Sequence, residues 1–121
     1  MVKELEREKN INYIDDCEYI NGKRNGKGKE YYYNGTLKFE GEYLFDKKWN
    51  GNGYDEKGNI IYKLIKGNGK VKDYFDDGTL LFEGEYLNGQ RHGKGKEYEY
   101  NLLKFEGEFL NGQRIGKGKE Y

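Results

Sequence analysis

The chain has 121 residues, of which 34% are apolar and 36% are charged, and its 22 Lys and Arg residues balance 22 Asp and Glu residues. A chain of this length forms one domain with a small buried fraction. A net charge of zero excludes the basic footprint of a general nucleic-acid binder, and no apolar run approaches the length of a transmembrane segment.

Aromatic side chains supply most of the capacity of this chain to form a core. It contains 13 Tyr, 6 Phe and 1 Trp, together with 19 Gly and no Pro. Aromatic residues favour strands and bury large areas, whereas Gly is common in turns. The composition therefore predicts an all-β protein with a thin aromatic core spread along a sheet.

Residues 1–12 are highly charged and rich in helix formers, which predicts a short N-terminal helix or a frayed tail. This stretch contains no apolar signal region. Cys17 and His92 are each the only residue of their type, which excludes an internal disulfide and a Cys/His zinc site. We therefore expect a cytoplasmic protein with no metal and no cofactor.

The first complete hairpin is expected within residues 26–44. Asn34-Gly35 separates two alternating aromatic runs, which is typical of a two-residue type I′ turn. Because strand side chains alternate, one face should carry charged pairs in water while the other face packs. The register implied by this turn pairs Lys29 with Glu40 and Lys27 with Glu42.

The middle of the chain is less regular. Residues 46–67 contain Trp49, a turn at 56–59 and an aliphatic strand at 60–65, which together indicate a shortened repeat. A regular hairpin around Asp77-Gly78 follows. It again predicts cross-strand ion pairs, Lys72 with Glu83 and Lys70 with Glu85.

The hairpin within residues 93–110 is one residue shorter. It carries Tyr100-Asn101-Leu102 at its turn and needs a three-residue loop to keep Lys96 opposite Glu106. Residues 116–121 then form an outgoing strand without a return partner, which predicts an open sheet edge.

Two phrases alternate along the chain. One reads KFEGEYL at 38–44, LFEGEYL at 81–87 and KFEGEFL at 104–110; the other reads GKGKEY at 26–31, 93–98 and 116–121. The last two copies of each phrase lie 23 residues apart, and a fixed period of this size marks a repeat array. We therefore expect residues 13–121 to form about five hairpin units, the first and last partial.

The combined phrase reads GEYLNGQRHGKGKEY at 84–98 and GEFLNGQRIGKGKEY at 107–121. This pattern resembles the MORN (membrane occupation and recognition nexus) repeat, and residues 31–41 look like the variant MORN repeats of bacterial proteins. The resemblance covers about residues 16–121 and is weakest across 46–67. It implies an elongated, single-layer antiparallel sheet of successive hairpins without catalytic residues. Family roles include scaffolding, dimerisation, binding of a partner segment and association with phospholipids.

The aromatic face is the first candidate site for a protein segment or a second copy of the chain. Its rings either fill the space between hairpins or form an exposed interaction stripe. The open edge at residues 116–121 is a further candidate surface. The candidate partner-binding residues are Tyr43, Trp49, Tyr86, Phe109, Phe39, Phe82 and Phe105.

Basic residues recur in the loops between hairpins. They are either solvated turn residues or, as the alternative function, contacts for anionic phospholipid headgroups at a membrane surface. The candidate lipid-binding residues are Lys23, Arg24, Lys47, Lys48, Arg91 and Arg114.

No pattern in the chain indicates catalysis. The Gly-Lys-Gly phrases lack the full Walker pattern, and none precedes a convincing helix. His92 occupies a position held by Asn25 and Ile115 in other units, and the repeated Glu residues face Lys. We therefore expect a non-enzymatic interaction or scaffolding module with no small-molecule substrate and no nucleic-acid partner.

Overall fold

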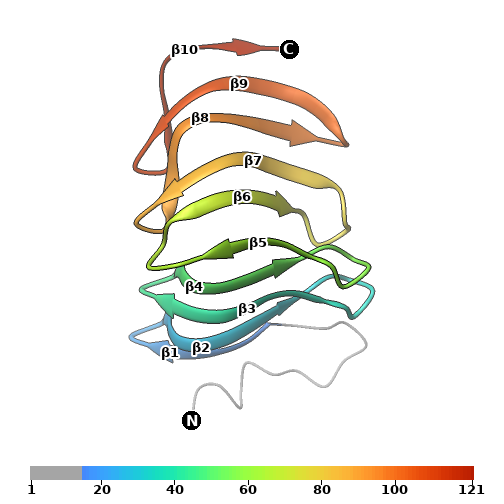
Figure 1. The fold of residues 1–121 in the computed structure, drawn as a ribbon, viewed down its shortest axis with the longest axis vertical. Helices are drawn as coiled ribbons and strands as arrows, with labels where there is room; N and C mark the ends of the chain where they lie inside the picture. The colour runs from blue at the N-terminus through green and yellow to red at the C-terminus, as the bar shows by residue number, and fades with distance from the viewer. Residues whose placement is uncertain (1–14) are drawn as a thin grey trace.

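A computed structural model describes residues 15–121 as an elongated antiparallel array. The strands follow one another in chain order, from β1 at one end to β10 at the other (Figure 1). The described part of the chain contains no helix, and thus no helix able to cross a membrane; the helix or tail predicted at residues 1–12 lies outside it. The strands are β1 (Asp16–Ile20), β2 (Lys23–Tyr31), β3 (Leu37–Leu44), β4 (Lys47–Tyr54), β5 (Ile60–Leu64), β6 (Gly69–Tyr74), β7 (Leu80–Leu87), β8 (Gln90–Glu99), β9 (Leu102–Leu110) and β10 (Gln113–Glu120).

The hydrogen bonding divides this array into two five-stranded sheets, β1 to β5 and β6 to β10. Only an isolated bridge between Ile65 and Asn68 joins β5 to β6. At this junction Leu64 and Val71 stand opposite glycines of the neighbouring strands and fill the core with their own side chains. The predicted all-β hairpin array is confirmed, with a break in its ladder at the irregular repeat.

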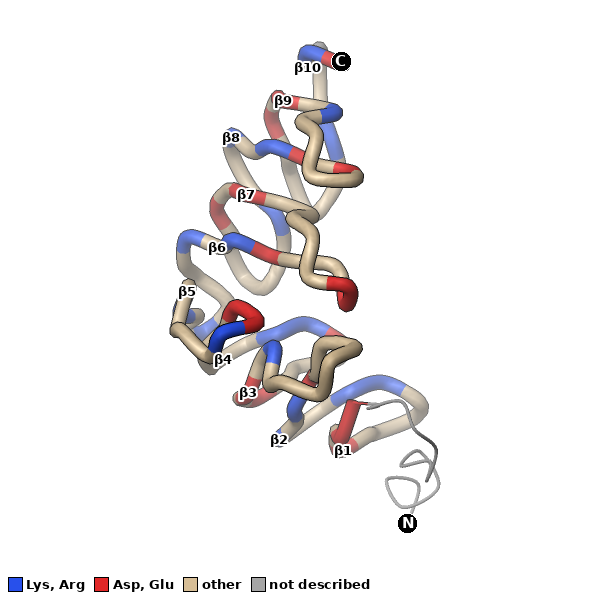
Figure 2. The backbone as a smooth tube through the Cα atoms, turned by 90° about the vertical axis from the view of Figure 1, so that its right-hand side faces the viewer, with Lys and Arg blue, Asp and Glu red and all other residues tan. Residues whose placement is uncertain are grey.

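The predicted register of opposite charges is confirmed in both regular hairpins, and the first of them forms an ion pair. Lys29 lies opposite Glu40 and Lys72 lies opposite Glu83, and the Lys29 Nζ and Glu40 Oε2 atoms are 3.7 Å apart. The alternation of basic and acidic strands continues along the array: basic segments on β6 and β8 face acidic segments on β7 and β9 (Figure 2). We call this charged surface the outer face.

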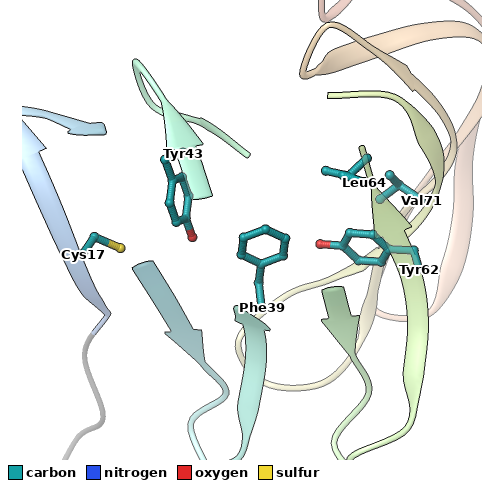
Figure 3. Packing of buried hydrophobic residues seen from close by; sticks show 6 residues of the cluster. All are labelled: Cys17, Phe39, Tyr43, Tyr62, Leu64 and Val71. Atoms are coloured by element: carbon teal, nitrogen blue, oxygen red, sulfur yellow. The ribbon is translucent and has the colours of Figure 1, made fainter. Parts of the chain in front are cut away.

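The core lies on the opposite face of the strands. In the first sheet Phe39 lies between Tyr43 and Tyr62, with Cys17 toward β1 (Figure 3). In the second sheet the core contains Phe82, Phe105 and Phe109, and Tyr86 packs against both clusters. Burying one such ring contributes roughly 2 kcal/mol, so the aromatic series holds successive hairpins together.

Glycines beneath these rings allow them to lie on the sheet. A Cβ atom at Gly95 would stand 2.8 Å from the ring of Phe82, which is closer than such contacts allow, and 3.1 Å from that of Phe109, which is tighter than most. The glycine of the repeated Gly-Lys-Gly phrase is thus required by the packing of aromatic side chains on both neighbouring strands.

The turn at Asn34-Gly35 is not the predicted type I′ turn. Of these two residues only Gly35 has a positive φ, of 90°. The Tyr32 N–H donates to the Thr36 carbonyl, closing a three-residue loop, and the Asn34 side chain accepts hydrogen bonds from the backbone and hydroxyl of Thr36 at 3.0 and 2.7 Å. This side-chain capping favours the right-handed conformation at Asn34. One extra residue in β3, Lys38, then restores the predicted register.

The hairpin formed by β8 and β9 differs from its prediction in the opposite way, because its turn is shorter than expected. A two-residue turn, with φ of 54° at Tyr100 and 62° at Asn101, replaces the predicted three-residue loop. Lys96 still pairs with Glu106 because the pairing shifts by one residue between Glu97 and Tyr98. The two turn types are therefore exchanged relative to the prediction, while both ladders keep their predicted register.

Candidate functional site

Most of the aromatic residues predicted to bind a partner lie inside the core. Each buried one is at most 3% exposed, and rings contact one another edge to face, with centroids 5.4 Å apart for Phe82 and Phe109. Tyr86 and Trp49 are half-buried. The rings fill the space between hairpins, so a partner cannot contact the buried ones while the sheet is intact. The buried members are Phe39, Tyr43, Phe82, Phe105 and Phe109.

Trp49 has a local role at the junction of the two sheets. Its carbonyl accepts a hydrogen bond from the N–H of Gly67 at 2.6 Å, and its ring lies against the same glycine. The indole thus packs on the turn that connects β5 to β6, which is where the repeat is irregular.

Four of the six cations predicted to contact lipid fold over aromatic rings instead. Arg24 stands opposite Tyr19 and Arg91 opposite Tyr86, so the register directs both side chains to the core face. Cation–π contacts of this kind contribute about 0.5–2 kcal/mol. Lys23 remains exposed and Lys47 is half-exposed. The stacked cations are Arg24 over Tyr43 (5.5 Å), Lys48 over Phe39 (5.0 Å), Arg91 over Phe82 (4.2 Å) and Arg114 over Phe105 (4.0 Å).

These arginines belong to a unit that recurs on β2, β8 and β10, which we call the aromatic seat. It consists of an arginine, a glycine four residues later and a glutamate six residues later. The arginine pairs with the glutamate at 2.8 Å on β2, 2.6 Å on β8 and 3.9 Å on β10. The three seats are Arg24/Gly28/Glu30, Arg91/Gly95/Glu97 and Arg114/Gly118/Glu120.

The β2 seat contains a buried polar network. The Tyr43 hydroxyl donates to Glu30, and Lys48 Nζ lies 3.6 Å from the Glu30 carboxylate and 3.8 Å from that of Asp73. Burial disfavours the Glu30 carboxylate, yet Lys48, Tyr43 and Arg24 together hold the pKa of Glu30 below its usual value. Burial also raises the pKa of Tyr43, so its hydroxyl remains a hydrogen-bond donor. These groups compensate one another's charges and stabilise the fold.

A regular series of exposed aliphatic side chains lies along the edge where β1, β3, β5, β7 and β9 end. Aliphatic residues at the ends of successive odd-numbered strands point to the outer face and are 38–62% exposed. We call them the aliphatic row. The sequence analysis did not single out this row, although Leu44, Leu87 and Leu110 each lie two residues after a Glu-Gly-Glu phrase. Its members are Ile20, Leu44, Ile65, Leu87 and Leu110.

The rest of the outer face is charged and shallow. Three hollows of about 460, 420 and 350 Å³ lie over the glycines and are walled by Lys and Glu side chains. Within residues 15–121 no group of three His, Cys, Asp or Glu side chains is placed to hold a metal ion. The outer face therefore offers broad polar contact with alternating charge.

Successive antiparallel hairpins of repeated sequence, held together by a shared aromatic core, define a β-hairpin repeat protein. The MORN repeat model matches three segments of the chain, residues 18–37, 82–98 and 105–121. The chain is a MORN-repeat protein. MORN repeats are generally modules for protein or membrane interaction and are non-catalytic. No curated protein and no solved structure matches this chain significantly.

Proposed function

We propose that this MORN array is a non-enzymatic protein-interaction or scaffolding module that binds a partner segment or a second copy of itself. The aliphatic row carries this proposal. Neighbouring strands lie about 4.8 Å apart, so an aliphatic side chain recurs roughly every 10 Å along the edge. A regular row of half-exposed apolar side chains bordered by charge is a candidate interaction surface. The outer edge of β10 offers a second accessible surface, whereas the buried rings support the array from within.

The test replaces Leu44, Leu87 and Leu110 together by Gln. These residues are 38–45% exposed, so we expect the variant to remain folded. Proteins captured from the native host's lysate are quantified for the wild type and the variant. We expect at least one captured protein to be lost. A matched control replaces Glu42, Glu85 and Glu108 by Gln, on the same strands and face but outside the row; equal capture by all three chains would contradict the proposal.

A second candidate is peripheral binding to anionic phospholipid. It is favoured by Lys23, Lys47 and Lys66, which lie at the turns beside the aliphatic row. A cation near an anionic surface contributes roughly 1 kcal/mol, and apolar side chains add to this when they enter the headgroup region. Three such lysines are fewer than the six cations expected from the sequence.

Cosedimentation with phosphatidylserine vesicles at low and high salt tests this second function. Replacing the three lysines by Ser should abolish salt-sensitive binding while leaving protein capture unchanged. If the wild type does not sediment with the vesicles at low salt, the phospholipid function is wrong.

A further inference from the structure

The aromatic seat is occupied on β2 and β8 by a ring from the following strand. On β2 a Cβ atom at Gly28 would stand 2.6 Å from the ring of Tyr43, and on β8 one at Gly95 would stand 3.1 Å from Phe109. Both rings belong to strands that pair antiparallel with the seat strand, Tyr43 opposite Gly26 and Phe109 opposite Gly93.

The third seat, on β10, has a ring on one side only. Arg91 contacts the rings of both Phe82 and Phe109, whereas Arg114 contacts Phe105 alone. Within residues 15–121 no strand pairs with the outer edge of β10. The arginine side chain is consequently 46% exposed on β10 against 20% on β8, and the glutamate side chain 77% against 22%.

The backbone of β10 can accept a further strand. The Tyr121 N–H donates to the Lys104 carbonyl on β9, at 3.0 Å, and Glu120 lies opposite Phe105. Hydrogen-bonding directions alternate along an antiparallel strand, so the N–H and C=O groups of Glu120 point to the outer edge. Unpaired edge groups of this kind are a template for strand addition.

The charges and the pairing register of β10 define which sequence could pair with its outer edge as an added strand. Lys96 on β8 lies between Glu83 and Glu106, and Lys29 on β2 lies between Asp16 and Glu40. Lys119 has an acidic neighbour, Glu106, on one side. The same pattern on its other side requires a carboxylate there, a small residue opposite Gly118 and an aromatic residue opposite Gly116.

We propose that the outer edge of β10 binds an extended acidic segment of the type Glu-Gly-Glu-Tyr from a partner protein, as a strand added to the sheet. One carboxylate faces Lys119, the small residue lies opposite Gly118, and the aromatic ring enters the seat beside Arg114. A tyrosine would donate its hydroxyl to Glu120, as Tyr43 donates to Glu30. This inference rests on the proposed function of the chain as a protein-interaction module. It does not involve the aliphatic row, which is the other surface in that proposal.

The experiment measures fluorescence anisotropy of a labelled peptide, LFEGEYLN, with the purified full chain. We expect saturable binding that weakens by about tenfold when both Glu residues of the peptide become Lys, because attraction is replaced by repulsion. Glu120→Pro should abolish binding, since it removes an outer N–H while leaving the pairing with β9 intact. Unchanged thermal unfolding confirms that this variant is folded.

Glu120→Ala serves as the matched control, because it keeps the backbone N–H. It should still bind, but it should lose the preference of the wild type for the Tyr peptide over LFEGEFLN. Absence of peptide binding, or equal binding by Glu120→Pro, would overturn the inference while leaving the test of the aliphatic row unaffected. A dimer dissociated by Glu120→Pro, without peptide binding, would assign the edge to a second copy and also overturn it.

Discussion

Lys48 of β4 and Asp73 of β6 approach to 3.8 Å across the junction where the sheet hydrogen bonding is interrupted. Both side chains are 16% exposed, and Lys48 also lies 3.6 Å from Glu30. Burial opposes the charge of Lys48, but Asp73, Tyr62 and Glu30 raise its pKa well above the usual value. A shared cation therefore links the two sheets where backbone pairing is limited to the isolated bridge between Ile65 and Asn68.

Replacing Lys48 by Met should reduce the free energy of unfolding by about 3 kcal/mol, because it leaves the Asp73 carboxylate without its cation and Glu30 with Arg24 alone. Urea denaturation provides the measurement. Lys47→Met is the matched control, since Lys47 is half-exposed and a change below about 0.5 kcal/mol is expected there. Similar losses in the two variants would show that the bridge has no special role.

Acid should weaken the fold through Glu30. Its pKa in the folded state lies below the ordinary value of 4.5, so the carboxylate stabilises the fold fully above about pH 4.5 and loses this effect as the pH falls further. Urea denaturation of the wild type and of Glu30→Gln at pH 7, 5, 4 and 3 measures the difference. We expect the wild type to be the more stable at pH 7 and the difference to shrink below pH 4.5. A constant difference over this range would contradict the assignment.

Gly95 should not tolerate a larger residue without a loss of stability, because the aromatic rings of the core occupy the space beside it. Gly95→Ala is expected to cost about 2 kcal/mol, because its Cβ would overlap the rings of Phe82 and Phe109. Combining it with Phe82→Leu should cost less than the sum of the two single changes, since the smaller side chain makes room. Lys94→Ala, on the outer face, should change stability by less than about 0.5 kcal/mol. Additive effects in the double variant would argue against direct contact.

The register could be predicted from the sequence because the charged pairs and the aromatic positions repeat in independent units. Lys29 opposite Glu40 and Lys72 opposite Glu83 follow from this repetition, even though the turn types were wrong. A bulge absorbs the difference of one residue, as at Lys38, so the ladder does not depend on the turn that closes it.

The surface was harder to predict than the ladder. The sequence analysis placed Arg24 and Arg91 in loops, whereas both lie near the start of a strand and face the core. Only the register of the turns that precede β2 and β8 determines this orientation. Alternation identifies the aromatic face but cannot say that the next hairpin covers it. The exposed Leu44 and Leu87 were visible as repeated positions, yet their accessibility depends on the absence of a covering layer.

Because each of the two hairpins has the turn type predicted for the other, substitutions in the two turns should change the stability of the fold in opposite directions. Tyr100 is 79% exposed and has a φ of 54°, a left-handed conformation that Asn tolerates better than Tyr, so Tyr100→Asn should raise stability by about 0.5–1 kcal/mol. Asn34→Gly should lower it by about 1 kcal/mol, because it removes the hydrogen bonds to Thr36. Urea midpoints of the two variants give the comparison. Asn34 would instead tolerate Gly without loss if its turn were type I′, so an unchanged or higher midpoint for Asn34→Gly would contradict the three-residue loop.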